Sequence, residues 1–305
     1  MAGWGWLHEY EVSAFGPTQT SYHSESFLRC AQRSDATVSE NWRIRSVEIQ
    51  GRKTAYRVVG GESGHPLVLL HAFGSNSGTW TRIATDLADA GFRVIAIDLP
   101  GHGRSDWLER YSLASMEDAL RLALDQLGLH QFDLIGHSLG GHLALRIAAR
   151  FPNRVGRLVV EAAPVPPRNE AEVETMAREG PQPSLWRSIR LLGFKRLIRI
   201  VLLRQFDLRA SSPILSELKN PMPDWWLGLD KISSQCLVVA SPNDGLISSR
   251  AKHLTARLRN AQLKLLGTGH HLHTNYREAF LEVLIPFLRP SCRGEAYLPE
   301  RKTDG

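Results

Sequence analysis

The 305-residue sequence predicts an α/β protein with a doubly wound, mostly parallel sheet of eight strands. Two observations lead to this fold class. Short runs rich in Val, Ile and Leu alternate with amphipathic helical patterns, which is the order of elements in a parallel α/β sheet. Several of these runs are almost entirely apolar, as expected of strands that helices cover on both faces.

The strands can be assigned in chain order. Ser46–Gln50 and Thr54–Val59, joined by Gly51-Arg52-Lys53, predict an opening hairpin. Six later runs predict buried strands: Pro66–His71, Arg93–Asp98, Phe132–Ile135, Val155–Val160, Gln235–Ala240 and Gln262–Leu266. Amphipathic helices are expected between them, for example at Ser115–Leu127, Gly140–Arg150 and Arg250–Leu258.

The alternation is interrupted once, and this interruption sets the expected domain organisation. Residues 164–226 have a helical, Arg-rich pattern, and we expect them to form a lid inserted into a core of residues 43–163 and 227–289. Residues 1–42 and 290–305 are polar without a sustained period, so we expect a flexible leader and a flexible tail.

Composition excludes several classes of function. No apolar run approaches the roughly 18 to 20 residues of a membrane span, and the first residues lack the pattern of a secretory signal. The three cysteines are far apart and form no metal-type or redox pair. The net charge of +6 comes from scattered Arg residues, so nucleic acid is not an expected partner. These features predict a cytoplasmic protein.

Gly136-His137-Ser138-Leu139-Gly140 matches the pattern Gly-x-Ser-x-Gly. An apolar run precedes it and an apolar helix follows, which predicts a strand–turn–helix with an exposed serine hydroxyl at the bend. The flanking glycines are expected because bulk at so tight a turn would collide with neighbouring backbone. Ser138 is therefore the expected nucleophile.

A serine hydroxyl needs a base and an orienting acid. Asp244 follows the strand Gln235–Ala240 and is the expected acid, with Glu161, at the end of another strand, as the alternative. His270 follows the last strand and is the expected base. His271 and His273 lie close enough in sequence to compete with it.

The tetrahedral intermediate of acyl transfer needs backbone N–H donors for its oxyanion. We expect one from Leu139, directly after the nucleophile. The loop His71-Ala72-Phe73-Gly74 follows a strand, and the N–H of Phe73 is the expected second donor.

The sequence resembles the α/β-hydrolase superfamily, in the large group that has a helical lid after the sixth strand. The resemblance covers about residues 44–289 and rests on Gly136-His137-Ser138-Leu139-Gly140-Gly141, Asp98-Leu99-Pro100-Gly101-His102-Gly103-Arg104-Ser105, and Gly269-His270 followed by Phe280. Ala72 departs from the family's usual Gly after His71. His102 has no second ligand at a suitable spacing, so no metal or other cofactor is expected.

Within that family, haloalkane dehalogenases and epoxide hydrolases carry Asp where this chain has Ser138. The resemblance therefore implies acyl transfer to water, on a small, largely apolar ester, thioester or lactone. Relatives that hydrolyse a carbon–carbon bond with the same triad, and non-catalytic receptors on the same fold, are the alternatives.

The expected lid supplies most of the expected substrate contacts. These contacts are His71 in the core and Trp186, Phe194 and Leu197 in the lid. Residues 187–204 predict two helices that divide at Gly193 and present a basic face of Lys195, Arg196 and Arg199. A basic face of this kind is more often solvated than substrate-binding. If it does bind substrate, an anionic or carrier-bound thioester is the alternative ligand.

Overall fold

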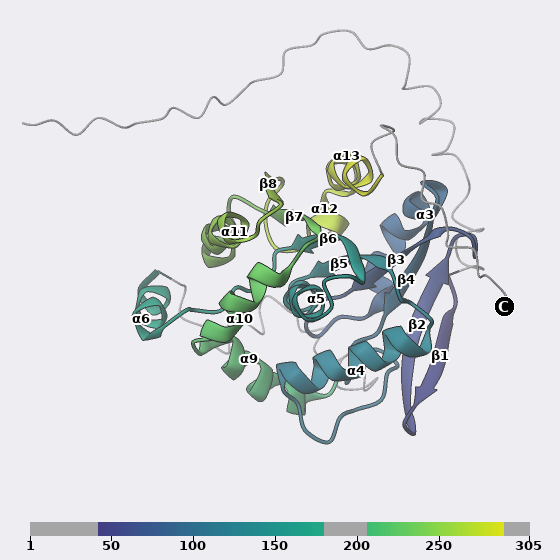
Figure 1. Ribbon diagram of the computed structural model, residues 1–305, viewed down its shortest axis with the longest axis horizontal. Helices are drawn as coiled ribbons and strands as arrows, with labels where there is room; N and C mark the ends of the chain where they lie inside the picture. Colours follow the sequence, from purple (N-terminus) through teal and green to yellow (C-terminus); the bar gives the residue numbers. More distant parts are fainter. Residues whose placement is uncertain (1–41, 180–205, 290–305) are drawn as a thin grey trace, which may run out of the picture. The chain divides into compact units, whose positions relative to one another are not determined.

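The computed structural model describes residues 42–179 and 206–289, and the expected sheet of eight strands is confirmed (Figure 1). The order across the sheet is β1-β2-β4-β3-β5-β6-β7-β8. The strands are β1 (Ile44–Ile49), β2 (Arg52–Val59), β3 (His65–Leu70), β4 (Phe92–Ile97), β5 (Phe132–His137), β6 (Val155–Glu161), β7 (Gln235–Ala240) and β8 (Ala261–Leu265).

The sheet is parallel from β4 to β8, whereas β2 runs antiparallel to both β1 and β4. Successive residues of a strand face opposite sides of the sheet. In β3, Val68 and Leu70 accordingly pack in one apolar cluster, and Leu67 and Leu69 pack in the other. Both faces of the sheet are therefore covered, which explains why the central strands are mostly apolar.

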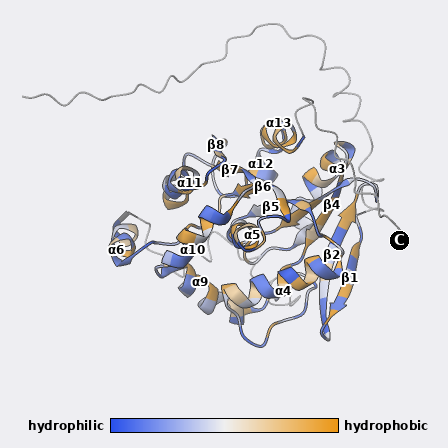
Figure 2. Ribbon diagram, viewed as in Figure 1, coloured by the Kyte–Doolittle hydropathy of each residue, from blue (hydrophilic) through white to orange (hydrophobic). Residues whose placement is uncertain are grey.

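The helices form a layer on each face of the sheet. Residues of α4, α5 and α11 belong to one apolar cluster, and residues of α3 and α13 belong to the other (Figure 1). The helices of the core are α3 (Thr81–Asp89), α4 (Leu113–Gln126), α5 (Leu139–Arg150), α11 (Gly245–Arg257), α12 (Leu272–Asn275) and α13 (Arg277–Leu288). Figure 2 shows many hydrophobic residues on the central α5 and a more hydrophilic α6.

Local sequence explains where α4 begins and ends. The Ser112 hydroxyl accepts a hydrogen bond from the Ser115 N–H, and the Ser115 hydroxyl accepts one from the Ser112 N–H, so the first turn is capped. The helix ends before Gly128, whose φ of 66° is in the left-handed region that glycine tolerates.

The chain leaves the sheet after β6 and returns at β7. Within the described residues, this stretch holds α6 (Glu170–Glu179), α9 (Ser211–Lys219) and α10 (Pro223–Gly228), with short turns η2 (Leu208–Ala210) and η3 (Leu229–Lys231). Its start is tied to the core because Arg250 donates to the carbonyl oxygens of Val165 and Pro166.

Several expectations fall on residues outside the described part of the chain. They include the two lid helices in 187–204, with their basic face, and the expected substrate contacts Trp186, Phe194 and Leu197. The expected leader and tail also lie outside it, apart from Trp42. In the described part, none of the helices has the length and apolar character that crossing a membrane requires.

Candidate active site

Ser138 occupies a strained turn between β5 and α5. Its φ of 53° and ψ of −119° lie in a sparsely populated region for a residue with a side chain. Such a conformation costs about 1–3 kcal/mol and persists only when the surroundings enforce it. The side chain is partly exposed, whereas His137 and Leu139 on either side are buried. Ser138 is therefore more accessible than either of its neighbours at this turn.

The glycines on either side of Ser138 allow α5 to lie close to the sheet. A Cβ on Gly136 would collide with the main chain of Gly140, and a Cβ on Gly140 would collide with the main chain of Leu70 and His71. Neither glycine has a positive φ in the described backbone. Their requirement is thus for close approach rather than for an unusual backbone conformation.

Asp244 and His270 are in direct contact. Asp244 follows β7 at the start of α11, and its Oδ2 lies 2.9 Å from Nδ1 of His270. Because a carboxylate can only accept, Nδ1 carries the hydrogen of this bond. The other ring nitrogen, Nε2, is then the one that can accept a proton. The side chain of His270 is 31% exposed and that of Asp244 is 20% exposed, so the pair is accessible to solvent.

The His270 loop also touches the turn that carries Ser138. Nε2 of His137 lies 2.7 Å from the main-chain oxygen of His270, and the centres of the two rings are 5.0 Å apart. The described residues show no hydrogen bond between the Ser138 hydroxyl and His270. In free enzymes this contact is often long and shortens only when substrate binds.

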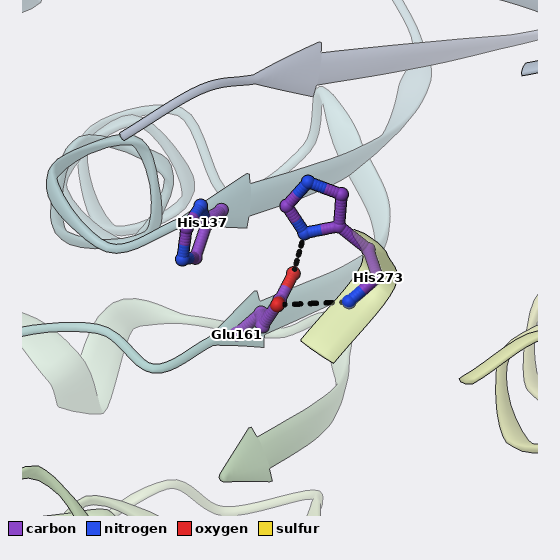
Figure 3. A group of neighbouring side chains, drawn as sticks. All are labelled: His137, Glu161 and His273. Carbon is purple, nitrogen blue, oxygen red and sulfur yellow. Dashed lines mark hydrogen bonds and ion pairs between the residues drawn. The ribbon is translucent and has the colours of Figure 1, made fainter. Parts of the chain in front are cut away.

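The competing acid and the third histidine of the loop pair with each other. Glu161, the last residue of β6, is fully buried and its Oε2 accepts from Nδ1 of His273 at 2.7 Å. Its Oε1 accepts from the N–H groups of Leu272 and His273, at 2.6 and 3.1 Å. Figure 3 shows the two contacts of this carboxylate with His273. The remaining nitrogen of His273 lies 3.1 Å from the hydroxyl of Thr79. Residues 266–273, which follow β8 and include His270, form the base loop. Glu161 therefore contacts the base loop, but at Leu272 and His273 rather than at His270.

The charge states of this buried group follow from its contacts. Burial opposes ionisation of Glu161, but the imidazoles of His137 and His273 and the hydrogen bonds from His273 outweigh it and lower the pKa of Glu161 to about 2. Burial lowers the pKa of His137 to about 3. Near neutral pH Glu161 is therefore an anion and His137 is neutral.

His137, Glu161 and His273 are also the group in the described part of the chain whose ligand types and spacing could hold a metal ion. One donor atom from each lies within 4.8 Å of the others. Both oxygens of Glu161, however, already accept hydrogen bonds from the base loop. An ion would have to displace these bonds, so we interpret the group as a hydrogen-bond network.

Leu139 and Phe73 carry the expected oxyanion donors. The first hydrogen bond within α5 joins the N–H of His142 to the oxygen of Ser138, so the N–H of Leu139 has no partner within the helix. The Phe73 ring packs 4.8 Å, centre to centre, from Phe206. The sequence offers no signal for this contact, because Phe206 lies far along the chain.

Ala72 and His71 shape the loop that contains Phe73. Ala72 has no positive φ, so its Cβ does not strain the backbone. His71 is fully buried; its Nε2 accepts from the N–H of Leu99 at 2.9 Å, and its Nδ1 lies 2.8 Å from the oxygen of Ala72. Neither nitrogen is left for a substrate, which differs from the contact expected of His71. The geometry instead favours a role in tying this loop to the end of β4.

Three fully buried histidines predict that the fold is sensitive to acid. Burial lowers the pKa of His102, His137 and His142 from an ordinary 6.5 to about 3. Below pH 6.5 the unfolded chain binds protons that the folded chain does not, so the free energy of unfolding falls as the pH falls toward 3. Glu161, whose pKa is lowered in the folded state, further decreases the free energy of unfolding as the pH falls from about 4.5 to 2.

Urea unfolding followed by tryptophan fluorescence at pH 7, 6, 5 and 4 measures this effect. We expect the unfolding midpoint to fall at each step. A midpoint that stays constant from pH 7 to pH 4 would contradict the neutral, buried state of these rings.

Comparison with known proteins identifies the fold. Residues 65–197 match a family model described as the alpha/beta hydrolase fold. An uncharacterized protein of Mycobacterium tuberculosis is 40% identical over 116 residues, which are 38% of this chain and 33% of that protein. The first curated relatives are thus matched over about a third of their length.

Two further comparisons extend over more of the chain. A 2-hydroxy-6-oxononadienedioate/2-hydroxy-6-oxononatrienedioate hydrolase of Paraburkholderia phymatum is 28% identical, over 75% of this chain and 88% of that protein. The crystal structure of a hydrolase from Pseudomonas aeruginosa PA01 superposes with a TM-score of 0.66 and 22% identity, covering 81% of this chain and 98% of that one. Together with the sheet order and the turn at Ser138, these similarities show that the chain has the α/β-hydrolase fold.

Proposed function

We propose that the protein is a serine hydrolase that cleaves a carboxylic ester or a related acyl bond. The observation that carries this proposal is the hydrogen bond of 2.9 Å between Nδ1 of His270 and Oδ2 of Asp244. The loop that carries His270 also contacts the strained turn of Ser138. A nucleophile, a base and an orienting acid then come from the loops after β5, β8 and β7. These loops lie at the carboxyl ends of parallel strands, where α/β proteins commonly bind their ligands.

In the proposed mechanism, the Ser138 oxygen attacks the acyl carbon while its proton passes to Nε2 of His270. Asp244 holds the other ring nitrogen and stabilises the imidazolium that forms. The N–H groups of Leu139 and Phe73 donate to the oxyanion. His270 then returns the proton to the leaving oxygen or sulfur, and the acyl group remains on Ser138. A water molecule then attacks the acyl carbon while its proton passes to Nε2 of His270. His270 gives that proton to the Ser138 oxygen as the carboxylic acid leaves, which restores the free serine.

Covalent labelling tests the nucleophile directly. A fluorophosphonate probe should label the wild-type protein, and mass spectrometry should place the adduct on Ser138. Ser138→Ala should fold like the wild type and take up no probe, because it lacks the attacking oxygen. Labelling of Ser138→Ala to the wild-type extent would end the serine hydrolase proposal. A panel of p-nitrophenyl esters, acyl thioesters and lactones then defines the acyl group.

The Paraburkholderia relative supports a second candidate, hydrolysis of a carbon–carbon bond. The substrate in its name is a dicarboxylate with a ketone and a hydroxyl group. It contains no ester bond, so its hydrolysis must cleave a carbon–carbon bond. For this chain, the same Ser138, His270 and Asp244 would serve that reaction. Turnover of such a ketone, with no turnover of any ester or thioester of the panel, would favour the second candidate.

A further inference from the structure

We propose that His137 is a positioning residue that holds the base loop against the nucleophile turn, residues 136–140. Glu161 is the second attachment point of that loop. This inference rests on the serine hydrolase function proposed above. It assigns a role to the variable residue that precedes Ser138 in the Gly-x-Ser-x-Gly pattern.

Sheet order makes such an attachment necessary. His270 lies after β8, whereas Ser138 lies after β5, and β6 and β7 separate these two strands. Neighbouring strands are about 4.8 Å apart, so the base loop crosses roughly 14 Å of sheet edge to reach the nucleophile. A loop of this kind sets the direction of the His270 ring only if its main chain is held at the far end.

The His137 ring supplies one attachment. Its Nε2 lies 2.7 Å from the main-chain oxygen of His270. Since a carbonyl oxygen only accepts, Nε2 carries the hydrogen. Nδ1 of the ring is buried and has no hydrogen-bond partner among the described residues, so this single bond is the polar contact of the side chain there. It joins the residue before the nucleophile directly to the residue of the base.

Glu161 supplies the second attachment at the next strand. Its carboxylate accepts from the first two N–H groups of α12, those of Leu272 and His273, and from the His273 ring. Figure 3 shows the carboxylate between the rings of His137 and His273. The base loop is thus held at His270 from β5 and at the start of α12 from β6. The side chain of His270 is left to point at Asp244.

Two amide variants separate the hydrogen bond from the mere presence of a polar side chain. In His137→Gln the amide nitrogen lies at about the distance of Nε2 from the main chain and can donate to His270. In His137→Asn the amide is one methylene shorter and cannot reach. We expect His137→Asn to lower kcat roughly 10- to 100-fold on the best ester of the panel, with KM changed much less, because a misplaced base affects the chemical step. His137→Gln should recover most of the lost kcat.

His142→Met provides a matched control. His142 is also fully buried and has one ring nitrogen 3.1 Å from a main-chain oxygen, that of Pro164. Within the described part of the chain its ring makes no hydrogen bond to the base loop. The His142→Met variant should lose about as much thermal stability as His137→Asn, and its kcat should stay close to that of the wild type. An equal loss of kcat in His142→Met would overturn the proposal, because any buried histidine would then give the effect.

The remaining outcomes separate this inference from the proposed function. If the wild type shows no turnover that depends on Ser138, both the function and the positioning role are refuted. If turnover depends on Ser138 but His137→Asn and His137→Gln have the same kcat, the positioning role alone is refuted. Thermal melts of both amide variants are needed to check that each is folded at the assay temperature.

Discussion

Replacing His270 with alanine should lower kcat for a p-nitrophenyl ester by on the order of 10⁵- to 10⁶-fold, as loss of the base does in other serine hydrolases. The reason is that, in the proposed mechanism, His270 takes the proton of Ser138 while Asp244 holds the other ring nitrogen. The His270 ring is partly exposed, so the variant should unfold at nearly the same urea concentration as the wild type. Stopped-flow or steady-state hydrolysis measures the first effect, and urea unfolding measures the second.

The neighbouring histidines provide the control for this prediction. His273→Ala removes a fully buried ring that contacts Glu161 and Thr79, so we expect a clear loss of stability and a smaller loss of kcat. His271→Ala should retain a substantial fraction of the activity. An active His270→Ala protein beside an inactive, folded His273→Ala protein would move the base to His273 and the acid to Glu161.

Asp244→Asn should lower kcat by on the order of 10⁴-fold without unfolding the protein. The amide that replaces the carboxylate can donate to Nδ1 of His270 and so favours the wrong tautomer, in which Nε2 carries the hydrogen. Asp244 is bonded to a partly exposed ring at the start of α11, so the change removes little packing. The kcat of the purified variant, measured at saturating ester, tests the prediction.

Glu161→Gln is the matched change at the alternative acid. Gln can still accept from the N–H groups of Leu272 and His273, but its amide nitrogen opposes the Nδ1–H of His273. We therefore expect a lower midpoint of urea unfolding and a kcat far less reduced than in Asp244→Asn. The opposite order of the two kcat values, in folded proteins, would reassign the orienting acid to Glu161.

Much of the fold can be predicted from local patterns. The apolar runs correspond to the central strands, because a strand covered on both faces buries most of its side chains, and such runs are visible without any partner. Boundaries shift by a residue or two: the run predicted at Phe132–Ile135 is β5 at Phe132–His137. The strand continues through Gly136 and His137 because their backbone pairs with β6, although their side chains give no apolar signal.

The candidate site divides in the same way. The residue types, their order along the chain and their places after strands predict Ser138, Asp244 and His270 as a group, since loops after parallel strands meet at one edge. What the sequence alone leaves open is the pairing, because Glu161 also ends a strand and three histidines lie within four residues. Hydrogen bonds across more than a hundred residues decide that Glu161 contacts His273.

By itself, then, the sequence determined the fold class, the strand order along the chain and the serine at the sharp turn, because each depends on periodicity or on a short motif. Only the tertiary structure decided that His270 contacts Asp244, that His71 is occupied by backbone groups, and that His137 reaches the base loop. These contacts depend on which strand ends are neighbours and on the direction of each ring. Neither is encoded by spacing along the chain, and both are set by how the loops pack at the edge of the sheet.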